Sequence, residues 1–324
     1  MNAFALVPAH GADHAQLVAR LSKSSVTKHF DAYEDIDWDH PRYRIDPDDR
    51  RFERPADCGI GRTAWYRDQP ASTRSRMGLH IAVAQLRLGV EFESILSRGL
   101  LEFANSLPSG SPDLRYAYHE VIEEAQHSLM FQEAIARAGL PVVGLQGFDA
   151  RAARGVPTLG RTFPALFFLH VLGGETPIDH AQRLELRRRD AIHPLFRRIM
   201  HAHVTEEARH ISFARSWLVT NAPTLTFVER LQLRTYAPFV LSQMARMMLE
   251  PPRWLLDTYR VPASVRREAF REDPEHRRRI TEGLRPIQEI AIESGILTNG
   301  LVPLWRALGI WSEGRAVTRL SPST

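Results

Sequence analysis

Cysteine is almost absent from this chain of 324 residues, where Cys58 stands alone. A single cysteine excludes a disulfide framework and a cysteine metal site. Long apolar runs are absent as well, because no stretch reaches the roughly 18 apolar residues of a membrane span. The first ten residues lack the basic and apolar segments of a signal peptide. These absences predict a soluble, cytoplasmic protein with no membrane partner.

Lysine is scarce too, since Lys23 and Lys28 are the only two, so nearly all of the positive charge is arginine. The formal net charge is only +4, although the isoelectric point is near 9.5. No zinc-finger or aromatic-basic pattern accompanies this charge, so we expect no nucleic-acid partner. Hydrophobic residues make up 44% of the chain, which is enough for the core of a large domain.

What the chain does contain is two short motifs of the form Glu-x-x-His. They read Glu123-Glu124-Ala-Gln-His127 and Glu206-Glu207-Ala-Arg-His210, so each is preceded by a second glutamate. One such motif would decide nothing, because a short pattern arises by chance. Each motif, however, lies on a predicted helix face whose other residues are mostly apolar, since residues three and four apart share a face. Carboxylates and imidazoles that point into an apolar interior are normally paired or bound to a metal.

A di-metal carboxylate site in a four-helix bundle needs one further glutamate from each of two other helices. Glu175 precedes the second motif by a helix-turn-helix length, and either Glu91 or Glu93 precedes the first. Glu93 falls on a mostly apolar helical line, whereas Glu91 shares its face with charged residues, so we prefer Glu93. The result is two half-sites of the same design at similar internal spacing.

His203 is a candidate for an additional ligand, because it lies four residues before Glu207 on the same helix face. The equivalent position in the first half-site is Glu120, which we expect to lie beside the ligands. Asp179 follows Glu175 by four residues and is a candidate to hydrogen-bond the back of a ligating imidazole. A helix cap at the surface is an equally good interpretation of Asp179.

The mixture of carboxylates and imidazoles indicates which metal to expect. Mg and Ca sites seldom use histidine, whereas imidazole suits iron and carboxylates can bridge two cations. The set therefore favours iron, with manganese second. Two metals about 3.5 to 4 Å apart can hold both atoms of one small molecule, and for two ferrous ions that molecule is O2.

These residues resemble those of the p-aminobenzoate N-oxygenase family, which are ferritin-like di-iron enzymes that oxygenate amines. The resemblance covers Gly78 to Trp217, and the histidine at position 203 separates the family from di-iron proteins that have six protein ligands. It implies an all-α, ferritin-like four-helix bundle with additional helices and an N-terminal arm. The implied metal ligands are Glu93, Glu124, His127, Glu175, His203, Glu207 and His210. No substrate-binding residue carries over.

The function implied by this resemblance is that of a non-haem di-iron oxygenase with two iron ions and O2 as co-substrate. It would convert a small-molecule amine to a hydroxylamine, and further rounds would give nitroso or nitro compounds, in secondary metabolism. Electrons would come from an external donor, because no flavin or nicotinamide fingerprint is present. A di-iron C-hydroxylase on the same scaffold is the alternative, and a ferritin-like iron-oxidising protein is disfavoured by the long connections. The oligomeric state is open, and a homodimer is compatible with the sequence.

The two half-sites must meet, so we expect a single domain over residues 1–324. Residues 1–70 are predicted to form a helix and an arm on the bundle, 71–220 the metal-binding bundle, and 221–324 covering helices. The expected long helices are Ala71 to Leu107, Asp113 to Ala138, Phe163 to Glu175, and Ile192 to Val219. Gly173 and Gly174 either admit a close neighbouring backbone or a substrate, or mark a helix that frays before Pro177. A glycine-rich crossover is expected over residues 142–160.

Overall fold

The structure is a computed structural model that describes residues 9–57, 59–188 and 191–311. The predictions made for Cys58 and for the first eight residues therefore fall outside the described residues. Within these ranges the chain is helical and contains no β-strand, which confirms the all-α prediction. No described helix is both long and apolar enough to cross a bilayer.

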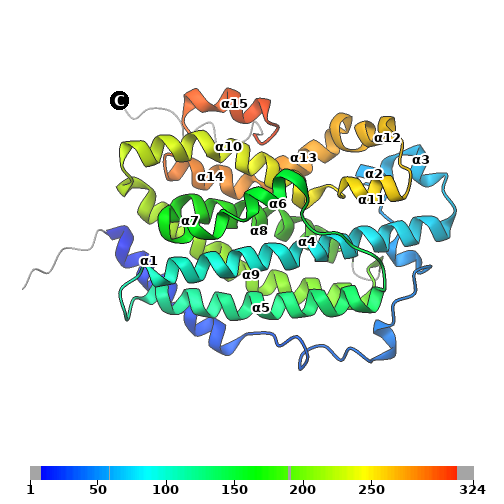
Figure 1. Cartoon of the computed structure of the whole chain (residues 1–324), viewed down its shortest axis with the longest axis horizontal. Helices are drawn as coiled ribbons and strands as arrows, with labels where there is room; N and C mark the ends of the chain where they lie inside the picture. The colour runs from blue at the N-terminus through cyan, green and yellow to red at the C-terminus, as the bar shows by residue number, and fades with distance from the viewer. Residues whose placement is uncertain (1–8, 58, 189–190, 312–324) are drawn as a thin grey trace, which may run out of the picture.

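Four long helices form the centre of the molecule (Figure 1). They are α4 (Ala71–Asn105), α5 (Pro112–Ala138), α8 (Pro164–Leu186) and α9 (Pro194–Asn221). Helices α4 and α5 pack along each other as one hairpin, and α8 and α9 pack as another. The bundle therefore consists of two hairpins, each carrying one Glu-x-x-His motif on its second helix.

Proline and glycine set the ends of these helices. Pro112, Pro164 and Pro194 each occupy the first helical position, where a missing N–H costs nothing. Ser111 is the N-cap residue of α5, and Asp113, the expected first residue of this helix, lies in its first turn. Gly139 ends α5 in the left-handed conformation, with φ at 62°.

Helix α8 is longer than the sequence suggested, because it continues through Pro177 to Leu186. Proline lacks the N–H that would bond to the carbonyl of Gly173, yet the helix is not interrupted. A Cβ at Gly174 would lie 1.9 Å from the ring of Phe92, and one at Gly173 would lie 3.2 Å from Leu241. The glycine pair therefore leaves room for side chains, not for the neighbouring backbone that was one expectation, and fraying before Pro177 is excluded.

The connection between the two hairpins contains two short helices, α6 (Gly147–Ala153) and α7 (Val156–Thr162). Helix α7 packs closely on α4, because Gly160 brings the two backbones together: a Cβ there would lie 2.0 Å from the carbonyl oxygen of Gly99. The crossover predicted over residues 142–160 is thus an ordered, partly helical segment and not a simple loop.

The N-terminal part of the chain lies against the bundle. Helix α1 (Ala9–Thr27) packs on α5 and α9. After it, residues 28–70 include the short elements η1 (Pro41–Tyr43), η2 (Arg50–Phe52), α2 (Gly59–Arg62) and α3 (Ala64–Arg67). Ile36, Trp38 and Phe52 from this arm are buried in one apolar cluster with residues of α4, α5 and α9. The arm is therefore part of the bundle's core.

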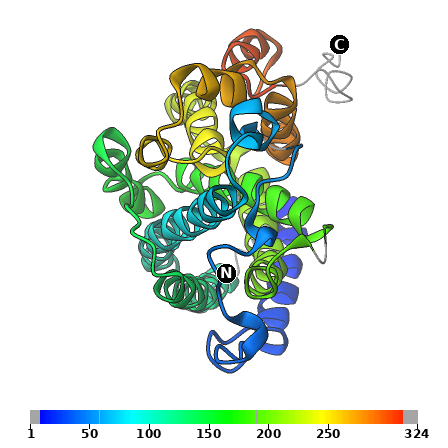
Figure 2. The same cartoon turned by 90° about the vertical axis from the view of Figure 1, so that its right-hand side faces the viewer.

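Helices that follow the bundle cover one side of it (Figure 2). They are α10 (Phe227–Leu249), α11 (Arg253–Thr258), α12 (Ala263–Arg267), α13 (Pro274–Gly283), α14 (Arg285–Glu293) and α15 (Val302–Ala307), with the short elements η4 (Ala222–Thr224), η5 (Glu268–Glu272) and η6 (Asn299–Leu301). Helix α10 begins with a capping box between Thr226 and Glu229 and packs on α8. Helices α13 and α14 follow each other directly and are divided at Leu284. The division of the chain into one domain stays a prediction.

Candidate metal centre

All four bundle helices contribute acidic or imidazole side chains to the interior. Helix α4 carries Glu93, α5 carries Glu124 and His127, α8 carries Glu175, and α9 carries His203, Glu207 and His210. Each of these seven side chains is at most 3% exposed. Glu91, the alternative to Glu93, instead lies 2.6 Å from Arg87 and accepts a hydrogen bond from the backbone N–H of Leu145.

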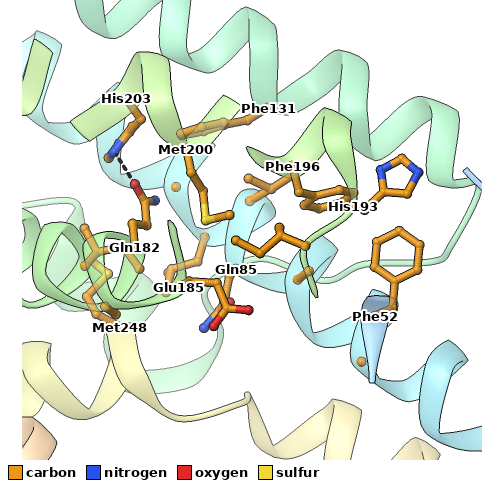
Figure 3. A pocket seen from close by; sticks show the side chains of 18 of the residues that line it. Phe52, Gln85, Phe131, Gln182, Glu185, His193, Phe196, Met200, His203 and Met248 are labelled. Carbon is orange, nitrogen blue, oxygen red and sulfur yellow. Dashed lines mark hydrogen bonds between the residues drawn. The ribbon is translucent and has the colours of Figure 1, made fainter. Parts of the chain in front are cut away.

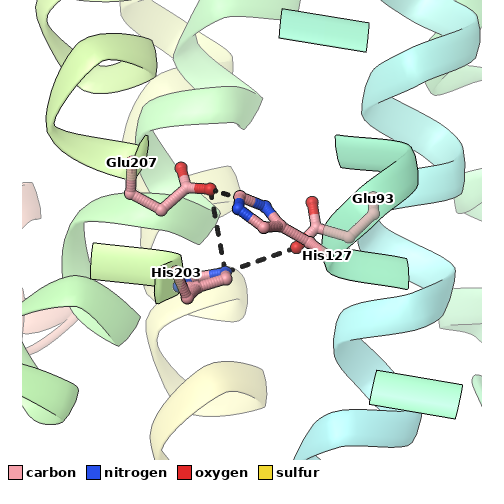
Figure 4. A group of neighbouring side chains, drawn as sticks. All are labelled: Glu93, His127, His203 and Glu207. Atoms are coloured by element: carbon pink, nitrogen blue, oxygen red, sulfur yellow. Dashed lines mark hydrogen bonds and ion pairs between the residues drawn. The ribbon is translucent and has the colours of Figure 1, made fainter. Parts of the chain in front are cut away.

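The ligand atoms fall into two neighbouring groups, and the atoms of each group lie within 4.8 Å of one another. The first group is Glu93, His127, His203 and Glu207, and the second is Glu120, Glu124 and His210. Figure 4 shows the first group, with Glu207 and His203 of α9 facing Glu93 and His127 across the bundle. Six of the seven predicted residues are thus brought together, and Glu120 joins them. Glu175 belongs to neither group.

Two carboxylates connect the groups. Glu124 lies 3.1 Å from Nδ1 of His127 through one oxygen and 3.2 Å from Nδ1 of His210 through the other. One oxygen of Glu207 lies 3.3 Å from His127, 3.2 Å from His210 and 3.7 Å from His203. A carboxylate between two ligand groups is suited to bridge two cations.

The outer ring nitrogens of the imidazoles have partners that sequence reasoning did not identify. Nε2 of His127 donates to Glu206 at 2.9 Å, and Nε2 of His210 donates to Glu123 at 2.7 Å. The glutamate that precedes each motif thus accepts a hydrogen bond from the imidazole of the other motif. We call Glu123 and Glu206 the two braces. Arg209 connects the two braces, because it lies 2.8 Å from Glu123 and 3.4 Å from Glu206.

These two hydrogen bonds could have been predicted from the sequence, because a second glutamate directly precedes each Glu-x-x-His motif. Asp179, which we had considered for such a role, does not fill it, because its carboxylate pairs with Arg183 at 2.7 Å. His203 is held by an amide instead, since its Nδ1 donates to Oε1 of Gln182 at 3.0 Å. Nothing in the spacing of the motifs pointed to Gln182.

Burial and crowding of like charges perturb the acidic groups. Burial raises the pKa of Glu93 well above its usual value, and the carboxylates of Glu124, Glu175 and Glu207 raise it further. Burial likewise raises the pKa of Glu175, with Glu207 and Glu124 adding to the effect. Burial also raises the pKa of Glu120 to about 8. The site therefore holds more carboxylates than its own protein cations can neutralise.

Several of these carboxylate oxygens have no hydrogen-bond partner in the described part of the chain. They are both oxygens of Glu120 and Glu175, Oε2 of Glu93 and Oε2 of Glu207. Buried polar atoms are nearly always satisfied, and an unpaired buried carboxylate is expensive. Two divalent cations would supply the missing partners, and a donor set of carboxylates and imidazoles suits iron. The residues present therefore fit a pair of metal ions.

A hollow reaches the first ligand group from one side (Figure 3). Glu93, Glu175 and His203 are among the residues that line it. Its wall is a mixture of apolar and polar side chains. Phe52, Phe92, Phe131, Phe196, Met200 and Met248 are apolar, and Arg51, Glu53, Arg54, Gln85, Gln182, Glu185 and His193 are polar or charged. In Figure 3 the hollow extends from His203 at one end to Phe52 and His193 at the other.

A bundle of four long helices with acidic and imidazole side chains gathered in two central groups defines a class, the ferritin-like di-metal carboxylate proteins. Residues 11–295 match the family described as P-aminobenzoate N-oxygenase AurF. The chain belongs to this family of di-iron oxygenases.

Relatives of the chain are found in mycobacteria. Proteins named as uncharacterised from two strains of Mycobacterium tuberculosis and from Mycobacterium bovis are each 35% identical to it over 298 residues. The aligned region covers 92% of this chain and 88% of each relative. No solved structure matches the chain.

Proposed function

We propose that the protein is a di-iron oxygenase that uses O2 to N-oxygenate a small-molecule amine, first to a hydroxylamine and in further rounds to a nitroso or nitro compound. The observation that carries this proposal is the hollow that ends on Glu93, Glu175 and His203. An apolar hollow that opens directly onto a metal centre is suited to a small organic substrate. Family membership supports an oxygenation, and supports an amine as the substrate.

Seven side chains would hold the two iron ions. They are Glu93, Glu124, His127, Glu175, His203, Glu207 and His210, with Glu120 beside the second ion. When bound, the iron supplies the activation of O2, which the side chains of the protein alone cannot perform. The chain contributes fixed ligand geometry, because Glu206 and Glu123 fix which nitrogen of His127 and His210 faces the centre.

Part of the wall of the hollow is apolar, and this part bears on the form of the amine that binds. Phe131, Phe196 and Met200 offer no charge to an ammonium group, and moving such a cation out of water is costly. Beside these side chains the neutral amine is favoured, and its nitrogen keeps the lone pair that N-oxygenation requires, although carboxylates also line the hollow elsewhere. The same side chains keep water away from the end of the hollow that faces Glu93 and His203.

An external reductant completes the proposal. Each round of N-oxygenation with O2 would consume two electrons beyond those of the amine, and the sequence carries no dinucleotide-binding fingerprint that would supply them. We therefore propose a separate electron-donor protein or a small reductant as a partner, and a place in secondary metabolism. A C-hydroxylase on the same scaffold is the second candidate, because a hollow of this kind also admits a C–H bond to the metal centre.

The test combines metal analysis with product analysis. The purified protein should contain close to two irons per chain, and His203→Ala should lower that content. The reduced protein is mixed with O2 and a panel of arylamines and amino-acid-derived amines, and the products are identified by mass spectrometry. Products oxygenated at nitrogen support the proposal. Products oxygenated only at carbon, or full turnover by a sample free of transition metal, would overturn it.

A further inference from the structure

His203 is held differently from the other two imidazoles of the centre. His127 and His210 each donate to a buried carboxylate, whereas His203 donates to the neutral amide oxygen of Gln182. A hydrogen bond to a carboxylate is roughly twice as strong as one between neutral groups. His203 is therefore the imidazole whose orientation is least firmly fixed by the protein.

Gln182 also lines the hollow, together with His203 itself. Its amide oxygen is occupied by His203, as the dashed line in Figure 3 marks. Its amide nitrogen makes no hydrogen bond to another protein group within the described residues, although the side chain is half-buried. Two N–H donors at the wall of the hollow therefore remain for a bound molecule.

We propose that Gln182 is a positioning residue through which a bound substrate fixes His203. The amide nitrogen donates to an acceptor atom of the substrate while the amide oxygen holds the imidazole. The terminal torsion of a glutamine is broad, so an amide with only one partner can turn, and a second partner restricts it. This inference rests on the proposed function, and its new element is the link from an acceptor atom of the substrate through Gln182 to His203.

The chain offers a matched control in Gln85 of α4. Gln85 lines the same hollow, and it makes no hydrogen bond to a predicted ligand in the part of the chain that is described. Replacing either glutamine by leucine removes one amide from the wall. Only Gln182→Leu, however, removes a contact to His203.

The experiment uses the full-length protein loaded with Co(II) and kept without O2 or reductant, so that no turnover is needed. Aniline, which lacks an acceptor, and the three aminobenzoates, which carry one, are titrated while the visible absorption of Co(II) is recorded. In the native protein we expect at least one aminobenzoate to bind about tenfold more tightly than aniline, which corresponds to one net hydrogen bond. Its binding should shift the Co(II) bands, because His203 becomes fixed.

The variants separate the two roles of the amide. Gln182→Leu should lose both the preference for aminobenzoates over aniline and the spectral shift, whereas Gln85→Leu should retain both. Gln182→Glu keeps an acceptor for His203 in nearly the same shape, so it should restore the Co(II) spectrum of the free protein without restoring the preference. Equal behaviour of Gln182→Leu and Gln85→Leu would overturn the inference, as would a native protein with no preference. Product identity plays no part in these measurements, so a failure of the proposed N-oxygenation would be seen separately.

Discussion

His127 on α5 donates a hydrogen bond of 2.9 Å to Glu206, which lies on the facing helix α9. The reverse pair, His210 on α9 and Glu123 on α5, is 2.7 Å long. In both pairs the glutamate directly precedes the first residue of its own Glu-x-x-His motif. The two glutamates of each motif thus have different roles. The second faces the centre, and the first orients an imidazole of the other hairpin.

Removing one brace should weaken metal binding without removing a predicted ligand. We expect Glu206→Ala to lower iron or cobalt affinity about 10- to 100-fold, because His127 loses the group that fixes its ring. Competition with a chelator measures this affinity. Glu133→Ala on α5 is the control, since Glu133 pairs with Arg137 near the surface and contacts no predicted ligand among the described residues. Equal affinities of the two variants would remove Glu206 from the site.

The choice between two neighbouring glutamates of α4 can be tested directly. Glu93→Ala should lower the metal content, because Glu93 faces His203 at 3.4 Å in the interior. Glu91→Ala should keep the metal content and reduce stability slightly, because Glu91 anchors the chain at Leu145 and pairs with Arg87. Metal analysis and thermal unfolding of both variants distinguish the two effects. A metal-depleted Glu91→Ala protein would reverse the assignment.

The two glycines of α8 should respond very differently to the same substitution. Gly174→Ala places a Cβ 1.9 Å from the ring of Phe92, so Phe92 or the helix must move. We expect a loss of about 1–3 kcal/mol in the free energy of unfolding, together with reduced turnover because Phe92 lines the hollow. Gly173→Ala meets only the flexible ends of Leu241 and Met244, at 3.2 and 3.3 Å. Denaturant unfolding should therefore show a near-neutral or stabilised Gly173→Ala protein, and similar losses in both variants would contradict this packing.

The metal-free protein should lose stability as the pH rises, and Glu120 should be one cause. Burial raises the pKa of Glu120 to about 8, against a usual value of 4.5, so the folded protein keeps a proton that the unfolded chain has released. Stability then falls between about pH 4.5 and 8, by up to about 1.4 kcal/mol per pH unit from this group. Glu120→Gln, which cannot ionise, should unfold with a shallower pH dependence. Denaturant titrations of both metal-free proteins at pH 5.5, 6.5 and 7.5 measure the difference; parallel curves would contradict the prediction.

Much of the helical framework could be predicted because its signals are local. The apolar lines around Glu124 and Glu207 follow the helical period, and prolines and glycines mark where helices begin and end. Both motifs lie on buried faces, and Glu93 rather than Glu91 faces the interior. A polar side chain on an otherwise apolar line was thus a sufficient signal for burial.

The remainder depends on contacts between distant segments. Pro177 was expected to limit its helix, but the packing of α8 against α9 and α10 outweighs the loss of one hydrogen bond. Asp179 turns to Arg183, and Gln182 takes the place beside His203. Both lie within a few residues of Glu175, so only the direction in which each side chain points distinguishes them. Gln182 contacts His203 on the neighbouring helix α9, whereas Asp179 pairs with a residue one turn further along its own helix.

The N-terminal arm contacts both the candidate metal centre and the hollow that leads to it. The backbone N–H of Phe30 donates at 2.9 Å to the oxygen of Glu206 that His127 does not contact. The N–H of Ala32 donates to Gln126 at 2.8 Å, and Phe52 lines the hollow. One protease cut between residues 32 and 52 would therefore loosen two features at once. Glu206, which orients His127, would lose support from the arm, and the hollow would lose part of its wall. During limited digestion, turnover should fall in proportion to the fraction of uncut chain, while the helical content of the protein is still unchanged.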